Sequence, residues 1–393
     1  MAEKSSHSRG HRVRRVCAGA VSAGCLVVAS LLLPVAPMVA AAAGWSAPVD
    51  LAKSYTMTGV SCVSPRFCMA VGAEPTGSEP EGVPMAFVWD GARWASTAAL
   101  PVPAGTGGWL EGVSCASAHY CLAYGVNLGA VPGETFGEVP TTIYSWDGRT
   151  WANTDFPWPS RSVDAISCAR TRSCTAVASP GGPVAESGPI TVATWDGRTW
   201  KSKDLPVSVP GTTPASMSCP AASFCMMVSE TDAMETDSAL NPLHPNIAYR
   251  GGPSGWAPVL WPDDGVGVQT VSCTSSVFCL AIAQNAYNPA RPKAVPRSVS
   301  FVWDGKAWAE RGELPADFAD ESLSCSSSTF CIAGGYLAQQ LYPPNPPGLA
   351  ERWDGTRWAS NSWPSTPGNQ VRAVSCVKGD FCMAVGLDAL SYN

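Results

Sequence analysis

The sequence is poor in charged residues and in histidine, and both shortages limit what the protein can do. Asp, Glu, Lys and Arg make up 14% of the 393 residues, and the chain has 4 histidines. A serine nucleophile with a histidine base therefore has little support, and no GxSxG segment stands in a strand-to-helix context. Paired cysteines with five residues between them also lack the spacing of zinc ligands. We expect no metal and no cofactor.

Basic residues are the scarcer of the two charge types. The chain has 25 Lys and Arg against 31 Asp and Glu, a formal net charge of -6. Residues 1–43 hold five of the basic residues and one of the acidic ones, so the remainder carries a formal charge of -10. Such a surface repels phosphate backbones and anionic lipid. We therefore expect no nucleic acid partner and, once residues 1–43 are removed, no membrane partner.

A long uncharged run stands at the N-terminus. Four arginines lie within residues 9–15, residues 16–44 carry no charge, and alanines fill positions 41–43. A basic start, an apolar run and small residues at the end are typical of a secretion signal. We predict a signal at 1–43, a single domain at 44–393, and a protein that is secreted.

Three other features of this segment bear on how the chain is exported. The apolar run is long enough to be a retained membrane anchor, but Pro34 and Pro37 near its end favour removal. A lipoprotein site at Cys25 is the weaker alternative. The pair Arg14 and Arg15 permits the twin-arginine route, so the sequence leaves that route and the general secretory route both open.

A cysteine motif recurs seven times along the rest of the chain. The first copy is VSCVSPRFCMAVG and the last is VSCVKGDFCMAVG, and successive copies are 53, 53, 51, 54, 52 and 51 residues apart. Such regular spacing indicates a repeat protein. An even, wholly paired set in an exported chain predicts disulfides. The predicted bridges are Cys62–Cys68, Cys115–Cys121, Cys168–Cys174, Cys219–Cys225, Cys273–Cys279, Cys325–Cys331 and Cys376–Cys382.

A second motif, WDGxxW, lies between the cysteine motifs. It occurs five times, first as FVWDGARW at residues 87–94. We predict a β-hairpin at each copy, with both turn residues tolerating positive φ. The copy at residues 249–256, YRGGPSGW, keeps aromatic ends but loses the aspartate, so the aspartate is a turn former that one repeat does without.

Each repeat then has four short strands, which predicts one blade of a β-propeller. We expect an all-β, seven-bladed β-propeller with one disulfide per blade. Seven cysteine hairpins accompany six WDG-like hairpins, and a strand containing Trp45 is left over at residues 44–49. We therefore predict six full blades and a seventh closed by the N- and C-terminal strands, which protects the sheet edges.

The alternation of VSCxSxxFCxAVG with WDGxxW resembles exported repeat proteins that are abundant in actinobacteria. It is more distantly similar to the sialidase-type, or Asp-box, propellers and to the photosystem II assembly factor. The Asp box has one residue between its aspartate and glycine, whereas here the two are adjacent, as at Asp90 and Gly91. The resemblance covers about residues 45–386 and implies a propeller fold, not a particular function.

Site residues are expected on the end of the ring that carries the segments between CMAVG and WDG, because these differ in every blade. Aromatic side chains and carboxylates there are candidates for ligand binding. Packing within loops and solvated surface charge are the competing interpretations, and for Trp109 the competing role is a packed plug over the central channel. Three other tryptophans, Trp158, Trp261 and Trp363, precede proline where other repeats have leucine, so we assign them to the core. The binding candidates are Trp109, Tyr287, Tyr336, Tyr342, Asp263 and Asp264.

Three functions remain open from the sequence. The first is a non-catalytic, monomeric binding or scaffold module for an extracellular glycan, cell-wall polymer or protein. The second is a sialidase-type glycoside hydrolase, against which most arginines of the mature chain fall in turns of the opposite end. The third is a purely structural envelope protein. We expect the first, without catalytic residues.

Overall fold

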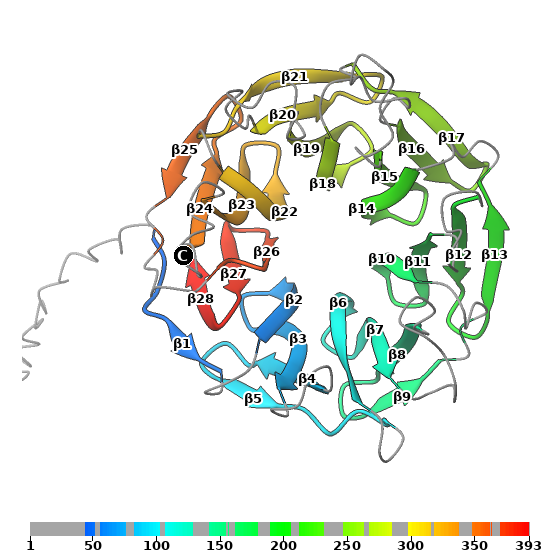
Figure 1. The fold of residues 1–393 in the computed structure, drawn as a ribbon, viewed down its shortest axis with the longest axis vertical. Coiled ribbons are helices and arrows are strands. Elements are labelled where there is room, and N and C mark those ends of the chain that lie inside the picture. Colours follow the sequence, from blue (N-terminus) through cyan, green and yellow to red (C-terminus); the bar gives the residue numbers. More distant parts are fainter. Residues whose placement is uncertain are drawn as a thin grey trace, which may run out of the picture. The chain divides into compact units, whose positions relative to one another are not determined.

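The predicted seven-bladed propeller is confirmed. The computed structural model describes residues 44–51, 56–75, 82–102, 107–128, 141–154, 156, 162–179, 189–205, 212–231, 247–262, 267–284, 298–315, 318–337, 348–361, 363 and 370–392. They form seven four-stranded antiparallel sheets, placed radially around a common axis (Figure 1). The predicted secretion signal lies outside the described residues.

Blades 1 to 6 are each built from four consecutive strands, and blade 7 combines three C-terminal strands with one from the N-terminus. The strands are, for blade 1, β2 (Thr56–Ser64), β3 (Phe67–Pro75), β4 (Gly82–Trp89) and β5 (Trp94–Ser96); for blade 2, β6 (Gly107–Ser117), β7 (Tyr120–Leu128), β8 (Thr141–Trp146) and β9 (Trp151–Asn153); for blade 3, β10 (Val163–Arg170), β11 (Ser173–Ala178), β12 (Thr191–Trp195) and β13 (Trp200–Asp204); for blade 4, β14 (Thr212–Ala221), β15 (Phe224–Thr231), β16 (Ile247–Gly252) and β17 (Gly255–Leu260); for blade 5, β18 (Gly267–Ser275), β19 (Phe278–Gln284), β20 (Ser298–Trp303) and β21 (Trp308–Glu313); for blade 6, β22 (Phe318–Ser327), β23 (Phe330–Leu337), β24 (Gly348–Trp353) and β25 (Trp358–Asn361); and for blade 7, β26 (Ala373–Val377), β27 (Phe381–Val385), β28 (Asp388–Tyr392) and β1 (Val49–Asp50).

The order of strands from the axis to the rim follows the two motifs. In each of blades 1 to 6 the strand ending in Ser-Cys is innermost and the strand leaving the second WDGxxW aromatic is outermost (Figure 1). The CMAVG-type strand lies second and is apolar along its length because neighbouring blades cover both of its faces. In β3, for example, five consecutive residues from Cys68 to Gly72 are buried. The sequence alternation therefore predicted this order correctly.

All seven predicted disulfides are present. Each joins the two cysteines that face each other across the first hairpin of a blade, with Cα atoms 4.0 to 4.1 Å apart. The pairing of β2 with β3 shows the register, with Cys62 opposite Cys68. Each bridge thus pins the innermost hairpin of its own blade.

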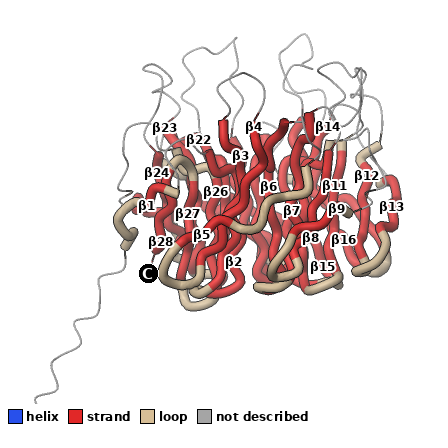
Figure 2. The backbone as a smooth tube through the Cα atoms, turned by 90° about the horizontal axis from the view of Figure 1, so that it is seen from below, coloured by secondary structure: helices blue, strands red, loops and turns tan. Residues whose placement is uncertain are grey.

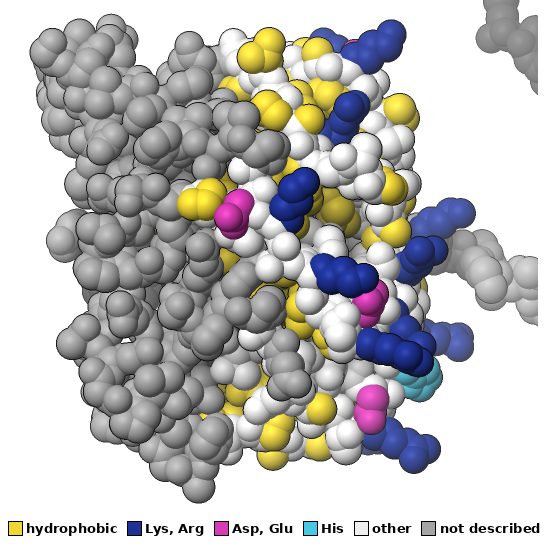
Figure 3. Space-filling model, turned by 90° about the vertical axis from the view of Figure 1, so that its right-hand side faces the viewer, with side chains coloured by type: hydrophobic (Ala, Val, Ile, Leu, Met, Phe, Trp, Pro, Cys, Tyr) yellow, Lys and Arg dark blue, Asp and Glu magenta, His cyan; other side chains and the backbone are white. Residues whose placement is uncertain are grey.

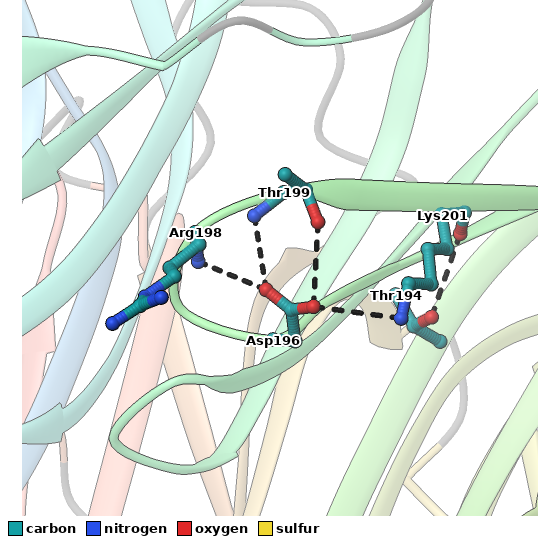
Figure 4. A network of polar contacts seen from close by, with 5 residues as sticks. All are labelled: Thr194, Asp196, Arg198, Thr199 and Lys201. Atoms are coloured by element: carbon teal, nitrogen blue, oxygen red, sulfur yellow. Dashed lines mark hydrogen bonds and ion pairs between the residues drawn. The ribbon is translucent and has the colours of Figure 1, made fainter.

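The WDG segments form the predicted hairpin turns, but the aspartate acts differently from the expectation. In the turn at Asp196, the glycine has a positive φ of 93° and the aspartate does not. Instead, the Asp196 carboxylate accepts hydrogen bonds from the backbone N–H groups of Arg198 and Thr199, each 2.9 Å long (Figure 4). The aspartate therefore caps the turn with its side chain, as Asx turns do. These bonds hold the pKa of Asp196 below its ordinary value.

Both kinds of turn lie at the same end of each blade. The indole of Trp303, at the end of β20, donates a hydrogen bond to the carbonyl of Ser276 in the cysteine hairpin, at 3.1 Å. Trp89, Trp146 and Trp353 make the equivalent bond in their blades. Figure 2 shows the described tight turns gathered at one edge of the ring. We call this the turn end, and the opposite edge the variable end.

Blade 4 corrects one sequence interpretation. The segment 249–256 was expected to keep aromatic ends at Tyr249 and Trp256, but the register places Gly251 opposite Trp256. Gly251 also pairs with Cys225, as Trp303 pairs with Cys279 in blade 5. Blade 4 therefore lacks the first tryptophan of the motif as well as the aspartate.

Blade 7 closes the ring as predicted, and it has four strands. Val49 and Asp50 of β1 pair with Ala389 and Asp388 of β28. Trp45 forms a bridge with Tyr392 and packs edge-on against it, with ring centroids 5.4 Å apart. This pair occupies the position of the paired tryptophans in other blades, so the short C-terminal strand completes the blade.

Adjacent blades are joined by a ring of hydrogen bonds that uses the serine of every Ser-Cys pair. The hydroxyl of Ser61 accepts a bond from the backbone N–H of Cys115 in the next blade, at 2.9 Å. The same bond recurs at every interface, including the one between blades 7 and 1. The remaining acceptor and donor pairs are Ser114 with Cys168, Ser167 with Cys219, Ser218 with Cys273, Ser272 with Cys325, Ser324 with Cys376, and Ser375 with Cys62.

Replacing one of these serines with alanine is expected to destabilise the protein. Ser272→Ala leaves the N–H of Cys325 without its acceptor, which costs about 1 to 2 kcal/mol for a largely buried donor. Denaturant unfolding measures the loss. Ser276→Ala, an exposed turn position in the same blade, is the matched control and should change stability by less than about 0.5 kcal/mol. Equal stabilities of the two variants would contradict a role for the serine ring.

The assignment of proline-preceding tryptophans to the core is confirmed where the structure describes them. Trp261 and Trp363 are 8% and 9% exposed, and Trp158 lies outside the described residues. Within the described ranges, the chain has no helix of the length and apolarity that crossing a membrane requires.

Candidate functional site

The two ends of the ring differ in what they present. The turn end is built from motifs that repeat in the blades, whereas the variable end carries connections of different sequence and length. Most of those connections, and with them the candidates Tyr287, Tyr342, Asp263 and Asp264, lie outside the described residues. The described part of the variable end consists of the first residues of the first and third strands of the blades and the last residues of the second and fourth strands.

Six innermost strands carry a β-bulge near the variable end. In β6 the register shifts between Leu110 and Gly112, which leaves Glu111 as the extra residue. A bulge re-aims the side chain of the unpaired residue and bends the strand. The extra residue always stands four positions before the first cysteine of its blade. The bulge residues of blades 1 to 6 are Thr58, Glu111, Asp164, Ala215, Gln269 and Glu321.

Glu111 interacts with Trp109, the strongest binding candidate of the sequence. Both residues lie on β6, and Trp109 pairs with Val126 of β7. Burial raises the pKa of the Glu111 carboxyl, and a hydrogen bond with the Trp109 side chain lowers it by a smaller amount. The structure thus places a half-buried indole beside a half-buried carboxyl at the variable end.

Asp164 is the equivalent bulge residue of the next blade. Its carboxylate accepts hydrogen bonds from the backbone N–H and the hydroxyl of Ser179, at 2.6 and 2.8 Å. Burial is the largest influence and raises the pKa of Asp164 to about 7, and the charge of Glu111 acts in the same direction. Two carboxyls from neighbouring blades are therefore close enough to influence each other.

Tyr124 of β7 connects these groups. Its hydroxyl donates a hydrogen bond to the backbone carbonyl of Asp164, at 3.1 Å. Burial raises the pKa of Tyr124, and the charges of Glu111 and Asp164 raise it further, so the phenol stays neutral. Gly112 makes room for this ring, because a Cβ there would lie 2.6 Å from the Tyr124 ring.

These residues form one polar cluster across blades 2 and 3, which we call the bulge cluster: Trp109, Glu111, Tyr124, Asp164 and Ser179. The remaining described candidate, Tyr336, lies on β23 of blade 6, where it pairs with Ala319 and Gly348. The structure therefore does not place Tyr336 on the two blades that carry Trp109 and its neighbours.

Sequence reasoning missed Glu111 and Asp164. A signal was present, because each is a carboxylate within an otherwise apolar inner strand, four residues before a cysteine. Thr58, Ala215 and Gln269 at the matching positions carry no charge, whereas Glu321 of blade 6 is also acidic. The β-bulge at this position cannot be recognised from the sequence.

The bulge cluster offers a flat aromatic surface, hydrogen-bond acceptors and one acidic group that exchanges its proton near neutral pH. Such a combination suits a ligand with hydroxyl or amine donors and an apolar face. Among the described residues, no three or more histidine, cysteine, aspartate or glutamate side chains gather as metal ligands would.

The raised pKa of Asp164 makes stability depend on pH in a defined direction. Its pKa is near 3.8 in an unfolded chain and about 7 in the folded protein. The folded state therefore holds the proton more tightly, and the contribution of this group to stability is greatest below about pH 4 and declines as the pH rises to about 7. Over this interval the free energy of unfolding of the Asp164→Asn variant should fall by up to about 4 kcal/mol less than that of the wild type. Guanidinium unfolding at a series of pH values measures the difference.

Asp196→Asn provides the opposite control. The pKa of Asp196 is lowered by the backbone N–H groups of its turn, so its contribution is present above about pH 4 and is lost as the pH falls through the lowered folded-state pKa. Parallel stability curves for the wild type and Asp164→Asn between about pH 4 and 7 would contradict the assignment for Asp164.

The fold defines the class of protein, a disulfide-bonded seven-bladed β-propeller, and several solved structures resemble it. YCF48 bound to D1 peptide has a TM-score of 0.55 and 13% identity, over 88% of this chain and 96% of that one. Streptogramin B lyase has a TM-score of 0.58 and 8% identity, over 89% and 97%. The xyloglucanase of family GH74 from Xanthomonas campestris has a TM-score of 0.52 and 14% identity, over 88% of this chain and 52% of that one.

These likenesses agree with the expected distant similarity to the photosystem II assembly factor, at the level of the fold. No protein-family model matches the sequence, and neither does any curated protein. Because the identities are low and the similar structures include both enzymes and a non-enzymatic assembly factor, they define the fold alone. The seven disulfides are typical of proteins that fold in an oxidising compartment.

Proposed function

We propose that the protein is a secreted, non-catalytic propeller that binds an extracellular ligand at its variable end and acts as a monomer. The observation that carries this proposal is the bulge cluster, in which Trp109, Glu111 and Asp164 present an indole and two carboxyls beside the connections that differ between blades. A glycan, a cell-wall polymer or a protein segment is the ligand class. The negative charge of the mature chain argues against nucleic acid and anionic membranes as partners.

Rigid placement supports binding at this end. The innermost strands are held by a disulfide in every blade and by the serine ring, so the bulge residues stand on a scaffold that loses little freedom on binding a ligand. Preorganisation of this kind reduces the entropic cost of association. The arginines Arg66, Arg93 and Arg357 lie in turns at the other end, so they are not available to hold a ligand here.

A glycan array and a set of soluble cell-wall polymers, each probed with the protein comprising residues 44–393, test the proposal. We expect saturable binding that Trp109→Ala and Glu111→Gln weaken about tenfold or more. Tyr336→Ala tests whether blade 6 shares the ligand. Arg357→Ala, an exposed change at the turn end, is the control and should leave affinity unchanged. Replacing the six variable connections with short Gly/Asn turns without any effect on affinity would overturn the proposal.

A glycoside hydrolase is the second candidate, and one observation favours it. Glu111 and Asp164 are neighbouring carboxyls with raised pKa values, and a raised pKa suits a general acid. Turnover of fluorogenic glycosides that is abolished by Glu111→Gln or Asp164→Asn would support this function. A purely structural role would give neither binding nor turnover.

A further inference from the structure

The packing between blades follows a rule at six of the seven interfaces. In one blade, the residue before the second cysteine is aromatic. It packs with two aromatic residues of the next blade. The first of these two lies opposite that next blade's own second cysteine, and the other pairs with the first across the outer hairpin. We call these three residues the aromatic trio. The trios are Phe67 with Trp146 and Trp151, Tyr120 with Trp195 and Trp200, Phe224 with Trp303 and Trp308, Phe278 with Trp353 and Trp358, Phe330 with Tyr392 and Trp45, and Phe381 with Trp89 and Trp94.

The interface between blades 3 and 4 departs from this rule on both sides. Ser173 stands where the other blades have phenylalanine or tyrosine, and Gly251 stands where they have tryptophan or tyrosine. Trp256 is the one member of the trio that remains there. Two large side chains are therefore missing from the same place, although they belong to different repeats.

A groove of about 480 Å³ occupies this place. Ser173, Trp195 and Trp256 are among the residues that line it, together with the segment 252–255 of the blade 4 turn. The Trp256 indole leans across Gly251, since a Cβ on that glycine would lie 2.5 Å from the ring. Trp256 thus covers Gly251 and forms one wall, and the volume is ample for an aromatic side chain and a few neighbouring residues.

The rim of the groove is basic. Lys201 and Lys203 of β13 both line it and are exposed. The Lys201 ammonium lies 3.6 Å from the Asp196 carboxylate (Figure 4), whereas Lys203 has no ion-pair partner among the described residues. Figure 3 shows basic side chains gathered on this side of the ring. Arg172 and Arg198 stand in turns of blade 3, and Arg250 lies on β16 of blade 4. The patch is positive on a protein of net negative charge.

We propose that the groove between blades 3 and 4 binds an acidic polypeptide segment through one aromatic side chain. The ring of that side chain enters the space that two aromatic side chains fill at the other interfaces, and Lys201 and Lys203 attract the flanking carboxylates. Buried aromatic anchors surrounded by charged rims are typical of peptide recognition. This site is independent of the bulge cluster, which lies on the innermost strands at the variable end.

The groove arises where two aromatic side chains are missing, which favours a polypeptide over a sugar as its ligand. At six interfaces the same space is filled by protein aromatic side chains, so its shape is complementary to such a side chain. An acidic sugar could use the lysines and an indole wall, but it would not reproduce the packing that the missing residues supplied. We therefore treat binding of an acidic polysaccharide as an outcome of the test.

Fluorescence anisotropy with two labelled synthetic peptides, Asp-Glu-Trp-Glu-Asp and Asp-Glu-Ala-Glu-Asp, tests the proposal on the protein comprising residues 44–393. We expect saturable binding of the tryptophan peptide, at least about tenfold weaker binding of the alanine peptide, and weaker binding of both as salt rises from about 0.05 to 0.5 M. Filling the groove with Ser173→Phe, alone and combined with Gly251→Trp, should reduce affinity about tenfold or more. Ser173→Phe introduces the residue found in other blades, so we expect a folded protein, whereas Gly251→Trp also requires the Trp256 indole to move, since a Cβ at Gly251 would lie 2.5 Å from it.

Lys203→Glu should also weaken binding, and Lys306→Glu in the turn of blade 5 is the matched charge control. Three results would each overturn the proposal: no binding of the tryptophan peptide up to about 1 mM, equal affinity for the two peptides, or unchanged affinity after Ser173→Phe. Binding of polygalacturonate at this groove without binding of the tryptophan peptide would overturn the polypeptide as its ligand. Trp109→Ala should not affect the peptide affinity, which separates this site from the proposed function.

Discussion

Full reduction of the seven disulfides is expected to unfold the protein at 25 °C. Each bridge closes a short loop, and the chain-entropy model assigns about 2 kcal/mol of stabilisation to a loop of this length. The contributions need not add, but seven of them together are comparable with the whole stability of a typical domain, about 5 to 15 kcal/mol. Circular dichroism after treatment with a phosphine reductant, with thiols counted by mass spectrometry, measures the outcome.

A single-blade variant separates the effect of one bridge from that of all seven. Replacing both Cys376 and Cys382 with serine removes the bridge of blade 7 and should cost about 2 kcal/mol or more while the protein remains folded. A fully reduced protein whose unfolding temperature lies within a few degrees of that of the oxidised protein would contradict the expectation. It would mean that the serine ring and the core alone hold the blades.

Loss of Trp45 is expected to have the second largest effect. Its indole packs against Trp363 and Tyr392, with centroid distances of 4.9 and 5.4 Å. Trp45 is half-buried, so Trp45→Ala should cost about 3 kcal/mol, the lower end of the range for a buried tryptophan. Denaturant unfolding measures this loss. Val49→Ala in β1, at a side chain 44% exposed, is the control and should cost less than about 0.5 kcal/mol.

Deleting residues 44–51 extends the same test from packing to ring closure. The deletion removes β1 and leaves the edge of β28 unpaired, and an exposed edge strand promotes association with other chains. The truncated protein should therefore be less stable than Trp45→Ala and should self-associate as concentration rises. Addition of a synthetic peptide of residues 44–51 should restore a monomer. A monomeric truncated protein of wild-type stability would show that closure by the N-terminal strand is unimportant.

Much of the fold could be predicted because its signals are local. Cys62 and Cys68 lie six residues apart, so their pairing across a hairpin follows from the chain itself. The Asp-Gly turns are equally local. The role expected for the aspartate was wrong in part, because in the turn at Asp196 its side chain caps backbone N–H groups and the glycine alone adopts a positive φ. Regular spacing then supplied the number of blades.

The candidate site was predicted less well, because its residues meet across blades. The place of Trp109 before an inner strand makes it a binding candidate, whereas the sequence did not lead us to expect its neighbour Glu111. Asp164 comes close to them because a bulge in each strand and the radial arrangement of blades bring adjacent inner strands together. Residues 53 positions apart in the sequence, Glu111 and Asp164, thereby interact, and no local sequence pattern shows that they are close in space.

The groove between blades 3 and 4 illustrates the same limit. The sequence shows that Ser173 replaces an aromatic residue in one repeat, and that the following repeat has an irregular turn. Only the register reveals that Gly251, and not an aromatic residue, faces Trp256. The two departures then fall at one interface.

The sequence by itself determined the number of blades, the disulfide partners and the terminal strand that closes the ring, since repeated short-range motifs carry this information. The tertiary structure alone decided which serine bonds to which cysteine N–H, which acidic residues share a buried environment, and where two missing aromatic side chains leave a groove. The physical reason is that these features depend on contacts between blades, which form only when the seven sheets pack around one axis.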